Sequence, residues 1–407
     1  MKKHIAIYVS NKDDKKSLIK NILSGNLIES LNGLNGALFS EITINKFIEE
    51  EKRHGRFDIA TKNKHSLMKS SEGERKKALL KHLIASKPEY LVADNVFGNL
   101  DVQSQEEIAL TLEELSKSIP VIQISNRKKD VLPFISKVYR FEGKQIIPFE
   151  NFDNPTPKLK HYFIQDLPKP LEQVSVESPS LVKFQNVSVS YLEKPIIKNI
   201  CWEIKTGEFW HLIGPNGSGK STILSLISGD NPKAFNQDIY LFGIKKGSGE
   251  SVWDIKKKIG YFTSEMLQGF KRSDTIERMI ISGFYDSVGL YKYPNEGQIL
   301  KAHEWLKLLN MFDIKNQNFQ TLSQGHKRLV LIVRAMVKHP PLLILDEPTN
   351  GLDDLDTIIF SELINKISKE SHTAILYVSH RHEIGLAPDY IYELIPNDKG
   401  SIGRVLK

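Results

Sequence analysis

Cysteine is nearly absent from the sequence, and long apolar runs are missing. The 407 residues include one cysteine, Cys201, which excludes an intramolecular disulfide and any metal cluster built from cysteines. Because Cys201 lies in a strand-like stretch, we expect a buried thiol that packs as a small hydrophobic side chain. No stretch approaches the roughly 18 apolar residues of a membrane-spanning helix, and the N-terminus lacks a signal-peptide pattern. We therefore expect a cytoplasmic protein, which could act peripherally at the inner face of a membrane.

The sequence also has little local clustering of charges of one sign. The net charge is +7, and such an excess can indicate binding to nucleic acid or to an anionic membrane surface. The lysine clusters Lys12–Lys16 and Lys256–Lys258 are short, and neither alternates with the aromatic residues of a base-stacking surface. We interpret the excess as a solvated, lysine-rich surface, which disfavours a nucleic-acid partner.

Prolines mark a division of the chain. Residues 151–180 show no sustained helical or strand period, and proline fixes φ and removes a backbone donor. This stretch is predicted to be a linker between a first domain, residues 1–150, and a second domain, residues 181–407. The prolines of the linker are Pro155, Pro157, Pro168, Pro170 and Pro179.

The two predicted domains resemble each other. Ser71-Glu72-Gly73 aligns with Ser323-Gln324-Gly325, and Lys16 aligns with Lys220 at a smaller offset. The first copy is therefore shorter between its two motifs, and residues matching 182–205 are missing from it. An internal repeat of this kind predicts two copies of one fold, of which the first is trimmed.

The second domain carries a phosphate-binding loop. A strand-like run leads into a glycine-rich loop and then into a helical pattern, which is the context that a P-loop requires. Its backbone N–H groups and the helix N-terminus would hold phosphate. Lys220 would reach the β- and γ-phosphates of ATP, and Ser221 would bind Mg²⁺. The predicted loop residues are Gly214, Pro215, Asn216, Gly217, Ser218, Gly219, Lys220, Ser221 and Thr222.

Two carboxylates end a second apolar run. Residues 342–345 are all Leu or Ile, which is typical of a fully buried parallel strand, and Asp346 and Glu347 follow. At the carboxyl edge of the sheet, Asp346 would join the Mg²⁺ site, and Glu347 would act as the general base toward the attacking water. An alternative is that the pair caps the next helix.

In this order the motifs resemble the ATP-binding cassette (ABC) family. Leu322-Ser323-Gln324-Gly325 resembles its signature motif and Val378-Ser379-His380 its switch histidine, while Tyr191 stands where the family places an aromatic residue under adenine. The resemblance implies an α/β fold with a mostly parallel sheet core and a helical subdomain. It also implies that Ser323 and Gly325 face nucleotide, that His380 assists catalysis, and that cassettes pair head to tail.

One family residue is missing, and a closer resemblance shares this absence. The glutamine expected near Ser264 is not there. Residues 279–291, with Trp253-Asp254-Ile255 before them, resemble the ModF group of tandem molybdenum-transport ATP-binding proteins, which also lacks that glutamine. This resemblance implies a transporter subunit of the molybdate type.

The first domain lacks the residues that we expect to bind and hydrolyse ATP in the second. Residues 10–17 contain no glycine and include Asp13 and Asp14, whose negative charge opposes phosphate. Asn95 stands opposite Glu347, and an amide cannot accept the proton of the water. Because Ser71 and Gly73 persist, we expect them to complete the phosphate loop of the second domain in a composite site. The alternative is that Ser71 only caps the following helix.

Three functions remain open from the sequence. The leading one is an ATPase with one active composite site, working as an accessory subunit of a transporter. The others are a non-transport cassette protein, such as an ABC-F-like translation factor, and a regulatory nucleotide switch. The ABC-F group usually joins its cassettes through a long charged helical arm, and the proline-broken linker offers none.

Overall fold

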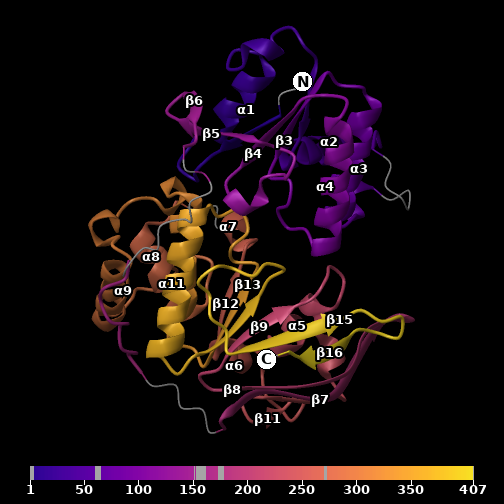
Figure 1. The fold of residues 1–407 in the computed structure, drawn as a ribbon. Helices are drawn as coiled ribbons and strands as arrows, with labels where there is room; N and C mark the ends of the chain where they lie inside the picture. Colours follow the sequence, from indigo (N-terminus) through magenta and orange to yellow (C-terminus); the bar gives the residue numbers. More distant parts are fainter. Residues whose placement is uncertain are drawn as a thin grey trace. The chain divides into compact units, whose positions relative to one another are not determined.

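The computed structural model describes residues 4–59, 66–150, 152, 162–172, 178–269 and 273–406. It divides into two compact units (Figure 1). The first consists of Met1–Pro157 with Gly351–Leu355, and the second of Lys158–Asn350 with Asp356–Lys407. Much of the predicted linker, 151–180, lies outside the described residues, and its bounds stay a prediction. No helix in the described part of the chain is long and apolar enough to cross a membrane.

The second unit is built on a six-stranded sheet in the order β12-β13-β14-β9-β15-β16, whose neighbours are parallel except for β15 and β16. The strand β13 is apolar and buried through Leu345, as its sequence predicts for a central parallel strand. The strands are β9 (Phe209–Ile213), β12 (Ile259–Thr263), β13 (Leu342–Asp346), β14 (Ala374–Val378), β15 (Tyr390–Ile395) and β16 (Ile402–Val405).

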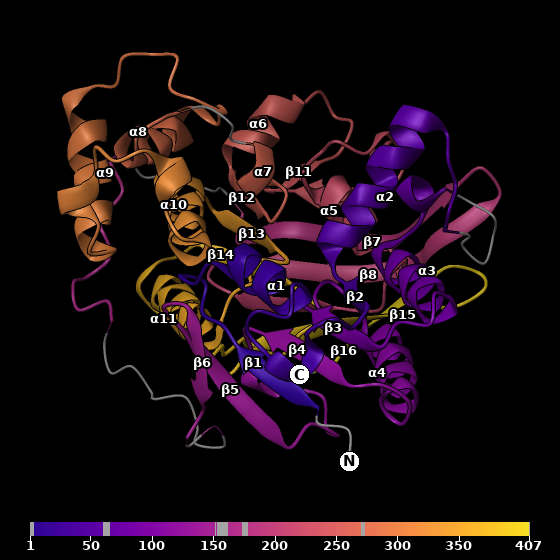
Figure 2. The ribbon, with the colours of Figure 1, turned by 90° about the horizontal axis from the view of Figure 1, so that it is seen from above.

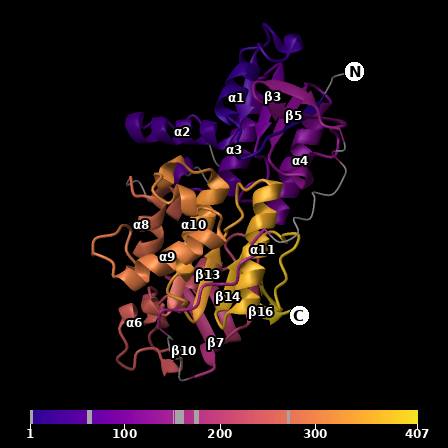
Figure 3. The same ribbon diagram turned by 90° about the vertical axis from the view of Figure 1, so that its left-hand side faces the viewer.

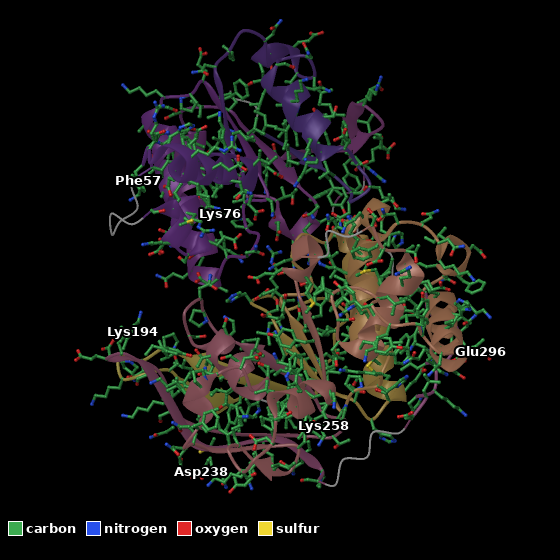
Figure 4. The ribbon with its side chains drawn as sticks, turned by 180° about the vertical axis from the view of Figure 1, so that it is seen from behind. Phe57, Lys76, Lys194, Asp238, Lys258 and Glu296 are labelled. Carbon is green, nitrogen blue, oxygen red and sulfur yellow. The ribbon has the colours of Figure 1, made fainter. Side chains whose placement is uncertain are left out.

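Helices surround this sheet. Figure 3 shows α8, α9 and α10 gathered at one side, where they form the helical subdomain. The helices are α5 (Lys220–Ile227), α6 (Val252–Lys257), α7 (Met266–Gly269), α8 (Ile276–Ile281), α9 (Glu296–Leu308), α10 (Gln324–Met336) and α11 (Asp354–Glu370), with 3-10 turns η4 (Pro232–Ala234), η5 (Ser282–Tyr285), η6 (Phe312–Ile314) and η7 (Phe319–Thr321). The start of α9 is marked by Glu296 in Figure 4.

A second, antiparallel sheet has the order β11-β10-β7-β8. Its strands are β7 (Ser180–Tyr191), β8 (Lys194–Lys205), β10 (Asp238–Leu241) and β11 (Ile244–Lys245), and Lys194 and Asp238 lie on it in Figure 4. Cys201 lies on β8 but is exposed, and its thiol donates to the side-chain oxygen of Asn186 at 3.1 Å. The expectation of a buried thiol was wrong, because alternation along β8 turns Ile200 and Trp202 inward instead.

The first unit repeats the six-stranded sheet in the same topological order, β2-β3-β4-β1-β5-β6. Among its described residues there is no counterpart of the antiparallel sheet. The repeat of a P-loop cassette fold with a trimmed first copy is therefore confirmed. The strands are β1 (Ile5–Tyr8), β2 (Gly36–Phe39), β3 (Tyr90–Asp94), β4 (Val121–Ser125), β5 (Lys137–Glu142) and β6 (Gln145–Pro148). The helices are α1 (Lys15–Leu23), α2 (Glu41–His54), α3 (Glu72–Ala85) and α4 (Val102–Ser116), with η1 (Glu29–Leu31), η2 (Leu67–Lys69) and η3 (Lys128–Asp130); α3 and α4 run beside β3 in Figure 2.

Candidate nucleotide-binding site

The glycine-rich loop joins β9 to α5 in the second unit. Gly214, Gly217 and Gly219 have φ values of 154°, 79° and 96°, a region in which a side chain is strained. A Cβ atom on Gly219 would lie 2.6 Å from Cγ2 of Ile197. Backbone conformation and packing therefore both require glycine here, and the loop leaves Asn216 and Gly217 exposed to solvent.

Lys220 begins α5 and bends back over the loop. Its ammonium group donates to the carbonyl oxygens of Gly214 at 2.7 Å and Pro215 at 3.1 Å. Its charge also lowers the pKa values of Asp346 and Glu347, which opposes the larger effect of burial on both. A cation thus lies at the mouth of the loop, close to both carboxylates, where phosphates would be held.

The carboxyl ends of the strands bring the remaining candidates to one edge of the sheet. Asp346 pairs with Val378 across β13 and β14, and Val378 pairs with Leu212 across β14 and β9. The residue after Asp346 is Glu347, and the residue after Val378 is Ser379. The residue after Leu212 is Ile213, which lies directly before the phosphate loop. The predicted catalytic and metal-binding residues are therefore neighbours of the loop, although their roles stay predictions.

Glu347 is nearly enclosed. Burial and, to a smaller extent, Asp346 raise the pKa of its carboxyl group to about 7, although Lys220 and hydrogen bonds from Ser379 and the backbone of His380 act to lower it. Its Oε2 accepts from the Ser379 hydroxyl at 3.3 Å. Its Oε1 lies 3.5 Å from His380 Nε2 and, among the described residues, accepts no hydrogen bond. A buried carboxylate oxygen without a donor is suited to accept a hydrogen bond from water.

The backbone of Glu347 adopts a left-handed conformation with φ 46°, and Asn95, its counterpart after β3, has φ 48°. The two units thus share the same turn after the same strand, with a carboxylate in one and an amide in the other. This match supports the alignment of Asn95 with Glu347 that the sequence predicts.

The donor set at this edge fits Mg²⁺, which prefers oxygen ligands. Ser221 and Asp346 line one cavity of about 520 Å³, and burial raises the pKa of Asp346 to about 6. The sequence interpretation missed Glu265, which follows the position of the absent glutamine and whose charge also raises the pKa of Asp346. An acidic residue one place beyond Ser264 was the available signal.

Tyr191 lies at the end of β7 and is 42% exposed. Its hydroxyl accepts a hydrogen bond from the side chain of Asn231 at 2.8 Å, and Asn231 also donates to Ser225 on α5. The ring is therefore tied to the helix that follows the phosphate loop. Its stacking on adenine stays a prediction.

The two signature-like serines both cap helices. Ser323 precedes α10, and its hydroxyl accepts from the N–H of His326 at 3.3 Å. Ser71 precedes α3 in a capping box with Glu74, so the alternative role given to Ser71 is observed. A Cβ atom on Gly325 would meet the carboxylate of Asp356 on α11, at 2.2 Å.

At the matching place in the first unit, a Cβ atom on Gly73 would lie 3.0 Å from the hydroxyl oxygen of Ser104. The helix α3 carries Glu72 and Glu74 in its first turn, whereas α10 carries no acidic residue there. Negative charge therefore lies near the N-termini of both α3 and α10. At α3 it comes from glutamates of the helix itself, and at α10 it comes from Asp356 on α11.

The loop of the first unit is filled by its own side chains. The carboxylate of Asp13 accepts from the N–H of Ser10 at 2.6 Å, and that of Asp14 accepts from the N–H of Ser17 at 3.1 Å. Lys15 forms an ion pair with Asp94 at 3.0 Å. These carboxylates take donors that a P-loop would offer to phosphate.

The structure corrects one part of the alignment. The helix α1 begins at Lys15, which reaches the buried Asp94, whereas Lys16 lines an open groove beside α1 and α2. The counterpart of Lys220 in the first unit is therefore Lys15. The alignment was wrong by one residue because the loop has no glycine to fix its register. Elsewhere in this unit Lys76, labelled in Figure 4, donates to the carbonyls of Asn95 and Gly98 and so holds the turn after β3.

Comparisons with known proteins agree with this geometry. The family model described as ABC transporter matches residues 197–350. The ABC transporter ATP-binding protein ModF of Escherichia coli is 36% identical over 329 residues, which cover 77% of this chain and 67% of that protein. An ABC transporter ATP-binding protein of Schizosaccharomyces pombe is 30% identical over 322 residues, covering 77% of this chain and 66% of that protein.

Among solved structures, the RNase-L inhibitor matches with a TM-score of 0.61 and 16% identity, over 99% of this chain and 85% of that one. At this identity the match shows the fold alone, and it extends over both units. The relatives above show that the chain belongs to the family of ABC transporter ATP-binding proteins, in a tandem-cassette form.

Proposed function

We propose that this ATPase hydrolyses ATP at one site, the phosphate loop of the second unit. The observation that carries the proposal is the contrast between the two loops. In the second unit the glycine loop is open to solvent and Lys220, Asp346 and Glu347 lie at its edge. In the first unit, Asp13 and Asp14 occupy loop donors and Lys15 is paired with Asp94.

The residues of the second unit can divide the chemistry among them. Mg²⁺, when bound through Ser221 and Asp346, would neutralise charge on the phosphates. Lys220 would bind the β- and γ-phosphates, and Oε1 of Glu347, which accepts no hydrogen bond among the described residues, would orient and deprotonate the attacking water. His380 Nε2 lies 3.5 Å from that oxygen. From there, the histidine would assist catalysis beside the attacking water.

We further propose that Ser71 and Gly73 complete this site within one chain, as the head-to-tail pairing of the family implies. The support is that serine and glycine persist at the signature position of a unit that lacks the other motifs. The capping role of Ser71 and the close approach of Gly73 to Ser104 give both residues a local structural role as well, so a functional test has to separate the two roles.

Matched arginine substitutions would test the pairing. In an intramolecular site, Ser71→Arg should abolish ATP hydrolysis by the monomer, because a bulky cation would block the signature helix. Ser323→Arg, which makes the same change at the start of α10, should leave most of the activity. The readout is phosphate release by the monomer, purified by size-exclusion chromatography. If Ser323→Arg is the damaging variant, the signature motif comes from a second copy of the chain.

We propose that the activity serves a membrane transporter, on which the chain would act as an accessory subunit at the inner face. Two observations support this. The E. coli relative is named as an ABC transporter ATP-binding protein. The cavity beside Ser221 is also lined by two apolar side chains, Met266 at the start of α7 and Val288 after η5, and Val288 is 56% exposed. The resemblance to the ModF group extends the proposal to a transporter of the molybdate type.

Capture of the ATP-bound form would test this function against the alternatives. The variant Glu347→Gln should hold Mg-ATP, so it should be retained on membranes when ATP is present and released when ATP is omitted. The control is the same variant with Lys220→Ala added, which should stay unbound. Retention on ribosomes instead would support the translation-factor alternative. ATP-dependent closure with no turnover in the native chain would support the regulatory switch.

A further inference from the structure

Behind Glu347 lies a serine that the proposed chemistry has not used. Ser379 follows β14 directly, is fully buried, and donates its hydroxyl hydrogen to Oε2 of Glu347 at 3.3 Å. The other carboxylate oxygen, Oε1, accepts no hydrogen bond among the described residues, and His380 Nε2 lies 3.5 Å from it. The serine therefore holds one oxygen of the carboxylate and leaves the other without a hydrogen bond.

The hydroxyl of Ser379 is itself oriented. Its oxygen accepts a hydrogen bond from the backbone N–H of Arg381 at 3.1 Å. Because one lone pair is taken by this N–H, the hydroxyl hydrogen is left to point elsewhere, and Glu347 receives it. The bond from Arg381 thus restricts the direction of the serine hydroxyl, which also contacts the side chain of the buried Tyr377.

The position of Ser379 is fixed from the other side by His211 on β9. The ring atom Nε2 of His211 lies 3.2 Å from the carbonyl oxygen of Ser379, and His211 is 1% exposed. A carbonyl oxygen only accepts, so Nε2 must carry the hydrogen. This hydrogen bond therefore joins the end of β14 to β9, the strand that leads into the phosphate loop.

The first unit contains the same arrangement without a carboxylate to hold. Ser125 ends β4, is buried, and accepts from the N–H of Arg127 at 3.2 Å, just as Ser379 accepts from Arg381. Its hydroxyl donates to the carbonyl oxygen of Arg127 at 2.8 Å, and not to Asn95. The same hydroxyl can thus be satisfied locally, so its direction toward Glu347 in the second unit needs a reason beyond burial.

We propose that Ser379 is a positioning residue for ATP hydrolysis, which holds Oε2 of Glu347 so that Oε1 faces the attacking water. This inference rests on the proposed role of Glu347. Without the hydrogen bond, the carboxylate would be held only through its contacts with His380 and would spend less time in the productive orientation.

The test compares turnover with nucleotide affinity. Ser379→Ala should lower kcat by about tenfold, the effect of one lost hydrogen bond to a charged group. The affinity for Mg-ATP, measured with a fluorescent analogue, should stay within about twofold. Ser379→Thr keeps the hydroxyl and should recover most of kcat. The matched control is Ser125→Ala, which removes the corresponding hydroxyl of the first unit and should leave kcat unchanged.

A double-variant cycle keeps the test valid if threonine does not fit. In the Glu347→Gln background, Ser379→Ala should cause no further loss, because both changes act through one carboxylate. The inference would be overturned if Ser379→Ala kept the kcat of the native chain. It would also be overturned if Ser379→Ala lowered kcat in the Glu347→Gln background by the same factor as in the native chain. If Glu347→Gln itself retains full activity, it is the proposed function that fails. Thermal melting of every variant identifies a loss caused by unfolding.

Discussion

Replacing Glu347 by glutamine should reduce ATP turnover by roughly a hundredfold or more, while binding of Mg-ATP is retained. The amide has nearly the same shape but cannot accept the proton of water. Because burial and Asp346 raise the pKa of the Glu347 carboxyl group to about 7, the native group can accept a proton near neutral pH. The neutral amide should also be tolerated in this buried place.

The measurement is single-turnover hydrolysis together with the affinity for a fluorescent ATP analogue. A matched control is Glu265→Gln, which makes the same chemical change at an exposed carboxylate near Asp346. The control should keep most of the turnover, since Glu265 is not placed as a base. Turnover by Glu347→Gln close to that of the native chain would remove Glu347 from its role.

Replacing Lys220 by alanine should weaken ATP binding by roughly tenfold to a hundredfold, the loss expected for charge-assisted hydrogen bonds to phosphate. The ammonium group lies over the loop carbonyls of Gly214 and Pro215 and is near two carboxylates. It is therefore the charge that would balance phosphate there. Equilibrium titration with a fluorescent nucleotide measures the effect.

Lys15→Ala is the matched control for this change, because Lys15 begins α1 as Lys220 begins α5. Nucleotide affinity should stay within about twofold. Thermal stability should fall, because the buried carboxylate of Asp94 loses its ion-pair partner. A marked loss of nucleotide affinity in Lys15→Ala would show that the first unit binds ATP.

The sequence was sufficient for the features that depend on local pattern. The glycine spacing predicted the phosphate loop, and the run before Asp346 predicted a buried strand ending at the site. The repeat predicted two sheets of one topology. Each of these signals lies within a short stretch of chain, so no knowledge of distant contacts was needed.

The sequence was insufficient where the prediction depends on the exact register of a strand or a loop, to within one residue. Cys201 was placed on the wrong face of β8, because a one-residue shift exchanges the two faces of a strand. Lys16 was chosen over Lys15 because a loop without glycine offers no fixed point for alignment. Ser379 gave no signal, since its role depends on Glu347 and Arg381, which only the folded chain brings to one hydroxyl.

The left-handed turn shared by Glu347 and Asn95 has a consequence for protein engineering. Asparagine adopts this backbone conformation with less strain than other residues, and for glutamate the strain is of the order of 1 kcal/mol. The first unit has the residue that suits the turn, and the second has the residue to which we assign the role of general base. A design method that ranked substitutions by folding stability alone would favour replacing Glu347, the residue that we propose to be the general base. At this position, backbone strain favours one amino acid and the proposed catalytic role requires another.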